Sequence, residues 1–120
     1  MAKTAATGEI DIYFGDDIRV PIGPYRVKGS EKLIDFREYS PMFSEVVTAA
    51  GGQVMRFDDE DLLRDVPGYI TFVLSKDEFP NIENKTTKFL FDVRGFHKVY
   101  GLKTLVQGTF TIHETYSEPN

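Results

Sequence analysis

Two histidines and two acidic clusters are the side chains of this sequence best suited to chemistry. His97 and His113 could act as general bases or bind a metal ion, and acidic residues gather at 16–17 and 58–65. Calcium takes about six to eight oxygen ligands, mostly from one or two short loops. The acidic run lacks the regular spacing of a calcium-binding loop, and neither histidine belongs to an H-x-x-x-H or H-E-x-x-H motif. We therefore interpret the acidic clusters as solvated loops and both histidines as surface residues.

Other catalytic motifs are missing from the sequence. It has no G-x-S-x-G nucleophile elbow, no phosphate-binding glycine motif and no cysteine. The lack of cysteine excludes disulfides, thiolate catalysis and cysteine-ligated metal centres. Asn84-Lys85-Thr86 matches the glycosylation pattern, which we interpret as accidental. We therefore expect no catalytic residue, no metal and no cofactor.

Composition limits the partners that the chain can take. A chain of 120 residues suits one domain, and its net charge of −5 disfavours binding to nucleic acid. The sequence has no apolar run near the roughly 20 residues that span a bilayer. Residues 1–8 have no apolar stretch of the secretory type, so we expect neither membrane insertion nor a signal peptide.

The dominant hydrophobic period is two residues, which is typical of half-buried strands. The expected core-facing sets are Ile10, Ile12 and Phe14; Ile70, Phe72 and Leu74; Phe89, Phe91 and Val93; and Phe110 and Ile112. Frequent turn residues separate these runs. The pattern predicts an all-β fold, an immunoglobulin-like or jelly-roll-like β-sandwich with at most one short helix. We expect a flexible arm at 1–8, one domain at 9–114 and a polar tail at 115–120.

Glycines and prolines indicate where the strands end or bend. Pro21 to Pro24 is expected to break or bulge the second strand, and Pro67-Gly68 fits a type II turn. Gly95, Gly101 and Gly108 are expected at bends or bulges between the last strands.

Two segments have alternative interpretations. Residues 40–51 could form a helix with Ser40 as its N-cap, or residues 39–47 could form a strand that pairs with 54–57 across Gly51 and Gly52. Residues 58–65 could form one helical turn or an acidic loop. The local pattern does not decide either case.

Aromatic residues are abundant, with ten Phe and six Tyr. Most Phe residues lie at alternating positions, so core packing explains them. Phe96 and Tyr100 break this alternation on either side of His97-Lys98-Val99. We therefore predict Phe96, His97 and Tyr100 as possible interface residues.

The order of several short motifs resembles a β-sandwich domain of tailed-phage virion proteins, found at the N-terminus of baseplate upper proteins and in tail or collar proteins. The motifs run in order from about Glu9 to Ile112. They are Gly15-Asp16-Asp17, Asp35-Phe36 with Tyr39, Leu74-Ser75-Lys76-Asp77, Phe89-Leu90-Phe91-Asp92-Val93-Arg94, Val99-Tyr100 and Gly108-Thr109-Phe110-Thr111-Ile112. The resemblance favours a strand at 39–47.

This resemblance implies a non-enzymatic structural component of a virion, in the tail, baseplate, collar or capsid surface. Its implied partners are other virion proteins and further copies of itself, and its location is the virion, assembled in the host cytoplasm. Residues 1–8 would then order on a neighbouring subunit. The alternative function is a carbohydrate-binding or adhesion module, and a third class is a small enzyme with a site that no motif marks.

Overall fold

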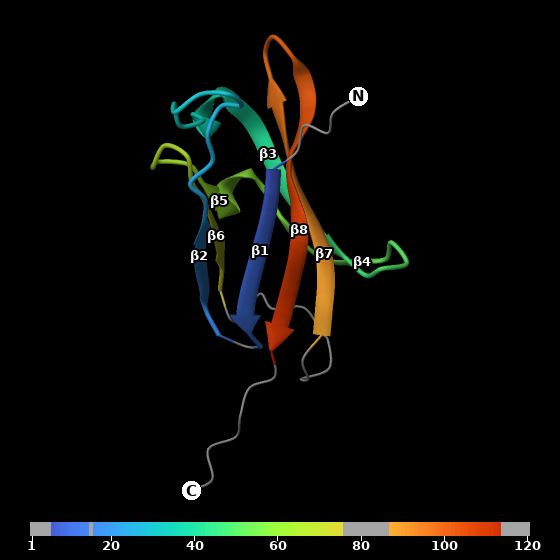
Figure 1. Ribbon diagram of the computed structural model, residues 1–120. Coiled ribbons are helices and arrows are strands. Elements are labelled where there is room, and N and C mark those ends of the chain that lie inside the picture. The colour runs from blue at the N-terminus through green and yellow to red at the C-terminus, as the bar shows by residue number, and fades with distance from the viewer. Residues whose placement is uncertain (1–5, 15, 76–86, 114–120) are drawn as a thin grey trace, which may run out of the picture.

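The computed structural model describes residues 6–14, 16–75 and 87–113. In these ranges, eight strands form two sheets that pack face to face (Figure 1). The five-stranded sheet has the order β1 (Ala6–Tyr13), β8 (Gly101–His113), β7 (Thr87–His97), β3 (Tyr39–Val47) and β4 (Gln53–Phe57). The three-stranded sheet has the order β2 (Ile18–Ile22), β6 (Ile70–Leu74) and β5 (Leu62–Leu63). The expected all-β sandwich is therefore confirmed.

The helical content of the described residues is two single turns. These are the 3₁₀ turns η1 (Phe36–Glu38) and η2 (Asp59–Asp61). Within the part of the chain that the structure describes, no helix is long and apolar enough to span a membrane.

The strand connections agree with the immunoglobulin-like alternative. β2, β6 and β5 share one sheet while β3, β7 and β8 share the other, as strands B, E, D and C, F, G do in an immunoglobulin domain. β4 extends the second sheet as strand C′ does in the variable type. β1 pairs with β8 in parallel, with Gly8 opposite Gly108. Each sheet therefore turns one face inward, and the core forms between them.

The core consists of the side chains that the two-residue period predicted. All the expected core-facing residues are buried except Phe14, which is only partly buried against the core. Four Phe rings meet at its centre: Phe57 packs on Phe72 with ring centroids 5.1 Å apart, and Phe91 and Phe110 complete the cluster. Burying one such side chain stabilises the fold by roughly 1.5–3 kcal/mol.

Both ambiguous segments are resolved by the sheet pairing. Residues 39–47 form β3, which pairs with β7 on one side and with β4 on the other. Gly51 adopts a positive φ of 98° between β3 and β4, which costs little only for glycine. The acidic segment forms the single turn η2 and then enters β5. The strand interpretation of 39–47 is thus correct.

Three expectations about strand boundaries need correction. Pro21 lies inside β2 without breaking it, because β2 is an edge strand and needs no hydrogen bond from that nitrogen. β1 begins at Ala6, so residues 6–8 are paired with β8 and do not belong to an arm. Gly95 and Gly108 lie inside long strands and not between strands. A side chain at either position would have no room, because the Tyr39 Cβ lies against Gly95 and the Gly8 carbonyl lies against Gly108. Residues 1–5, 115–120 and the Asn84–Thr86 motif lie outside the described residues.

Candidate functional site

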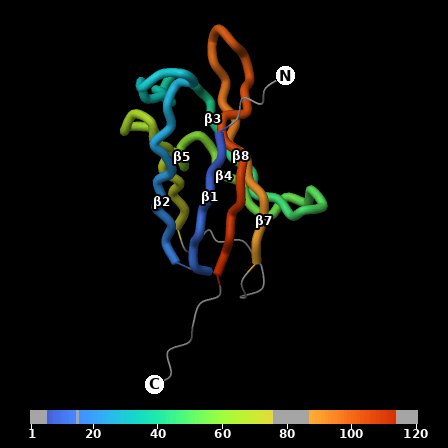
Figure 2. The backbone as a smooth tube through the Cα atoms, in the orientation of Figure 1, coloured from blue at the N-terminus to red at the C-terminus, as the bar shows by residue number. Residues whose placement is uncertain are grey.

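The β7–β8 hairpin projects beyond the other strands at one end of the sandwich (Figures 1 and 2). We call residues 96–102 the hairpin tip. Large apolar side chains are exposed on it: Phe96 at 48%, Val99 at 69%, Tyr100 at 65% and Leu102 at 54%. Apolar side chains gathered on a projection are typical of an interaction surface.

His97 organises the turn at the hairpin tip. Its Nδ1 accepts hydrogen bonds from the backbone N–H groups of Val99 at 3.0 Å and Tyr100 at 3.4 Å. Nδ1 is therefore unprotonated, and in the neutral ring the proton is on Nε2. Nε2 lies 3.8 Å from a carboxylate oxygen of Glu38. The imidazole also stacks on Tyr100 and meets Tyr39 edge-on, with ring centroids 4.6 Å and 5.1 Å apart.

The expectation that both histidines are surface residues is wrong for His97. Its side chain is only 12% exposed, because Tyr39 and Tyr100 cover it. His113 is 35% exposed and its Nε2 lies 3.0 Å from Asp11 Oδ1. This pair is at the opposite end of β8 from the hairpin tip, so the two histidines belong to separate surfaces.

The three predicted interface residues do not share one face. His97 and Tyr100 stack on each other. Phe96 pairs with Leu102 across the hairpin, and alternation along β7 points it away from His97. Sequence reasoning therefore found a real cluster in His97 and Tyr100, with Phe96 on the opposite face.

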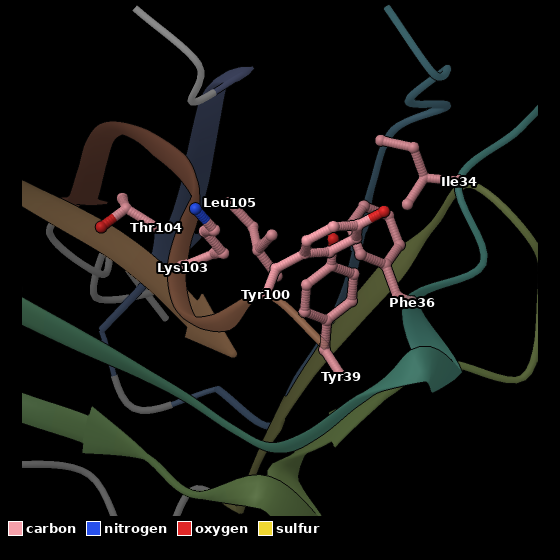
Figure 3. Close-up of a pocket in the computed structure, with 7 residues that line it drawn as sticks. All are labelled: Ile34, Phe36, Tyr39, Tyr100, Lys103, Thr104 and Leu105. Atoms are coloured by element: carbon pink, nitrogen blue, oxygen red, sulfur yellow. The ribbon is translucent and has the colours of Figure 1, made fainter. Parts of the chain in front are cut away.

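Two adjoining hollows lie between the hairpin and the segment that connects β2 to β3. Figure 3 shows the residues that line the first of them. The two hollows have volumes of about 260 and 420 Å³, and they share Ile34, Tyr39 and Tyr100. We call the two hollows together the aromatic groove. The first is also lined by Phe36, Lys103, Thr104 and Leu105, and the second by Val27, Lys28, Lys32, Leu33, Asp35 and Glu38.

Backbone hydrogen bonds hold the wall of the groove that precedes β3. Ile34 N–H donates to Tyr25 O at 3.0 Å, and Gly68 N–H donates to Ile34 O at 2.8 Å. Tyr25 N–H donates in return to Gly68 O at 2.8 Å. Gly68 has a positive φ of 83°, as the predicted turn at Pro67-Gly68 requires. This wall is therefore preformed, which lowers the entropic cost of binding.

Asp35 and Arg37 support the floor of the groove. Asp35 Oδ1 accepts hydrogen bonds from the backbone N–H and Nε of Arg37, at 3.1 and 2.9 Å. The side-chain hydrogen bond from Arg37, followed by the backbone one, lowers the pKa of the Asp35 carboxyl. Asp35 is thus the N-terminal cap of η1. This turn places Phe36 in the core and Tyr39 at the start of β3.

The rim of the groove is positively charged. Lys28, Lys32 and Lys103 are exposed, and within the described residues none of their ammonium groups lies within ion-pair distance of a carboxylate. The rim also has two acids, Asp35 and Glu38. Asp35 forms an ion pair with Arg37. Burial raises the pKa of the Tyr39 hydroxyl, and the Glu38 charge raises it further. The groove thus offers aromatic surface, three ammonium groups and a protonated phenol.

Sequence reasoning missed most of the groove. Leu105 is far along the chain from Ile34 and Tyr39, and each of the three resembles an ordinary strand or loop residue. The sequence has one feature that could have indicated the groove: Ile34 and Phe36 are apolar residues in a segment with no clear strand period.

The acidic cluster at 58–65 is occupied by internal ion pairs. Asp58 Oδ1 lies 2.8 Å from Arg56 Nε, and Asp59 Oδ1 lies 3.0 Å from Arg64 Nη2. Asp59 Oδ1 also accepts a hydrogen bond from the Met42 backbone N–H at 2.7 Å. Across the described ranges, no three His, Asp or Glu side chains converge as a metal site. The cluster here ties η2 to β3.

Comparison with known proteins adds little to this geometry. No family model matches the chain, and no curated protein is significantly similar to it. One solved structure, the 2,6-sialyltransferase of Vibrionaceae Photobacterium sp. JT-ISH-224 in complex with CMP and lactose, is similar at 10% sequence identity and a TM-score of 0.40. The similarity covers 94% of this chain and 19% of that chain, so the chain spans about a fifth of that enzyme's length.

Proposed function

We propose that this protein is a non-enzymatic structural component of a tailed-phage virion, in the tail, baseplate, collar or capsid surface. Its role is to join protein subunits through its surfaces. The motif order from Glu9 to Ile112 supports the virion context. The observation that carries the assembly role is the hairpin tip with its exposed Phe96, Val99, Tyr100 and Leu102.

The hairpin tip is built to keep its shape while apolar residues face water. Eleven residues of β7 pair with β8, from Thr87 to His97, and His97 closes the turn. A rigid projection loses little conformational entropy when a partner covers it. The whole chain has a net charge of −5, and such a charge opposes non-specific association of the free subunit.

The assembly role is tested by the solution mass of the purified protein, measured by light scattering over a concentration series. We expect a species heavier than the single chain of 13.7 kDa. Changing Phe96 and Leu102 to Thr removes apolar surface and keeps β propensity, so it should lower that mass. Leu90→Thr is the matched control, since Leu90 is exposed at 46% on the same strand away from the tip.

The virion context is tested by mass spectrometry of phage particles purified after induction of the host strain. We expect the protein in the particles in a fixed ratio to other structural proteins. Recovery of the protein only in the soluble fraction, with particles complete without it, would overturn the proposal.

Carbohydrate binding is the second candidate function. Tyr39 and Tyr100 line the groove beside the polar groups of Lys103 and Thr104, and such a combination suits a sugar ring and its hydroxyls. A glycan screen tests this function. Binding that is lost in Tyr100→Ala would favour it over assembly.

A further inference from the structure

We propose that the aromatic groove binds residues 114–118 of a second copy of this chain, so that copies join head to tail. This inference rests on the proposed assembly role and names the partner of the groove. Residues 114–118 are Glu-Thr-Tyr-Ser-Glu and follow β8 directly.

The groove and this segment have complementary chemistry. The groove offers Tyr39 and Tyr100 as aromatic surface and is rimmed by Lys28, Lys32 and Lys103. The segment places one aromatic ring, Tyr116, between two carboxylates, Glu114 and Glu118. Residues two apart share a face of an extended chain, so a bound extended segment would turn these three side chains toward the groove together.

A tyrosine is suited to the apolar part of the groove. A buried Tyr ring covers roughly 150–250 Å² and its hydroxyl still reaches a polar partner at the rim. The first hollow holds about 260 Å³ and is lined on its apolar side by Ile34, Phe36 and Leu105. Tyr116 would enter there, and its flanking carboxylates would meet the lysines.

The segment cannot reach the groove of its own subunit. β8 begins at the hairpin tip and ends at His113, at the opposite end of the sandwich from the hairpin tip (Figure 1). The groove lies at the hairpin end, where Tyr100 and Lys103 line it. Leu105, in the groove wall, is eight strand residues from His113, a distance of about 26 Å at about 3.3 Å per residue. Tyr116 is three residues beyond His113 and reaches at most about 10 Å from it. The partner groove must therefore belong to another copy.

The resulting contact is heterologous, since it joins two different surfaces of the same protein. Such contacts form rings when the rotation between copies closes and fibres when it does not. The charge contribution at an exposed rim is screened by salt. We therefore expect the association to weaken as the salt concentration rises.

Two complementary variants of the full chain test the proposal by light scattering. The groove variant changes Lys28 and Lys103 to Glu. The segment variant changes Glu114 and Glu118 to Gln and Tyr116 to Ala. Both variants also carry Phe96→Thr and Leu102→Thr, so that this face of the hairpin tip cannot join copies, and each alone should have the mass of one chain, 13.7 kDa. Mixed in equal amounts, they should form a one-to-one pair of twice that mass and nothing larger, because only one intact groove and one intact segment remain per pair.

Lys88→Glu is the charge control, because Lys88 is exposed on β7 away from the groove. It should assemble as the unchanged protein does. Circular dichroism and thermal unfolding show whether each variant is folded. In a second measurement, a synthetic peptide of residues 112–120 is added to the folded segment variant, and amide NMR signals at Tyr39, Tyr100 and Lys103 should shift.

Each contrary result has a distinct meaning. If the unchanged protein assembles and both variants assemble equally well, this pairing is wrong while the assembly role stands. If the unchanged protein stays at one chain's mass up to millimolar concentration and the peptide shifts no groove signal, the pairing is wrong and the assembly role loses its support. Binding of a glycan in the groove without assembly would overturn the pairing in favour of the second candidate function.

Discussion

The ring nitrogen Nδ1 of His97 accepts a hydrogen bond from the backbone N–H of Val99 at 3.0 Å, so one side chain of β7 closes the turn that leads into β8. The same ring lies between Tyr39 and Tyr100. His97 therefore connects the shape of the hairpin tip to the wall of the aromatic groove.

We expect His97→Phe to loosen the turn and keep the ring packing. The substitution removes the acceptor for Val99 and Tyr100, and one such hydrogen bond contributes about 1 kcal/mol. Amide hydrogen exchange at these two residues should accelerate about fivefold, as this energy implies. Unchanged exchange in the variant would contradict the proposed role of Nδ1.

Asp35→Asn should flatten the pH dependence of stability in acid. The pKa of Asp35 is lowered in the folded state by its hydrogen bonds from Arg37. A carboxyl with a lowered folded pKa stabilises the fold above its unfolded pKa, near 3.9, and this contribution is lost as the pH falls through the folded value. Thermal unfolding from neutral pH down to about pH 2 should therefore show a shallower decline for the variant. Parallel curves for the two proteins would show that the cap contributes nothing.

Gly108→Ala should detach β1 from β8. A Cβ at residue 108 would collide with the backbone carbonyl of Gly8 in the paired strand. Backbone cannot move aside as a flexible side chain does, so we expect a loss of about 1–3 kcal/mol in the free energy of unfolding. Gly52→Ala is the control, because its nearest neighbour is Thr48 Oγ1 at 3.4 Å. Urea denaturation of both variants measures the difference, and equal losses would refute the close approach of the strands.

Phe57→Ala should be among the most damaging core changes. Phe57 is fully buried. It packs against Phe72 of the opposite sheet and against Phe110 of its own sheet. Deleting a buried Phe side chain costs about 3–5 kcal/mol, against a total stability of about 5–15 kcal/mol for a domain. Phe57→Leu keeps most of the volume and should cost less. A loss below about 1 kcal/mol for the alanine variant, measured in urea, would show that the cluster does not hold the sheets together.

The core was the part of the molecule most open to prediction from sequence. The alternation at Ile70, Phe72 and Leu74 is a local pattern, and each of these residues is buried as expected. The strand at 39–47 was not determined by its local pattern, which also fits a helix. Its pairing with β7 decides the matter, since the hydrogen bonds of Phe43 and Val46 are supplied by residues about fifty positions away.

By itself the sequence determined that the chain is an all-β sandwich, where most turns lie and which residues fill the core, because a two-residue period and turn chemistry are read within a few neighbouring residues. The tertiary structure alone decided the parallel pairing of β1 with β8, the partial burial of His97 and the aromatic groove. The groove joins Ile34 to Leu105, and such contacts depend on how distant strands pack. No local pattern records that packing.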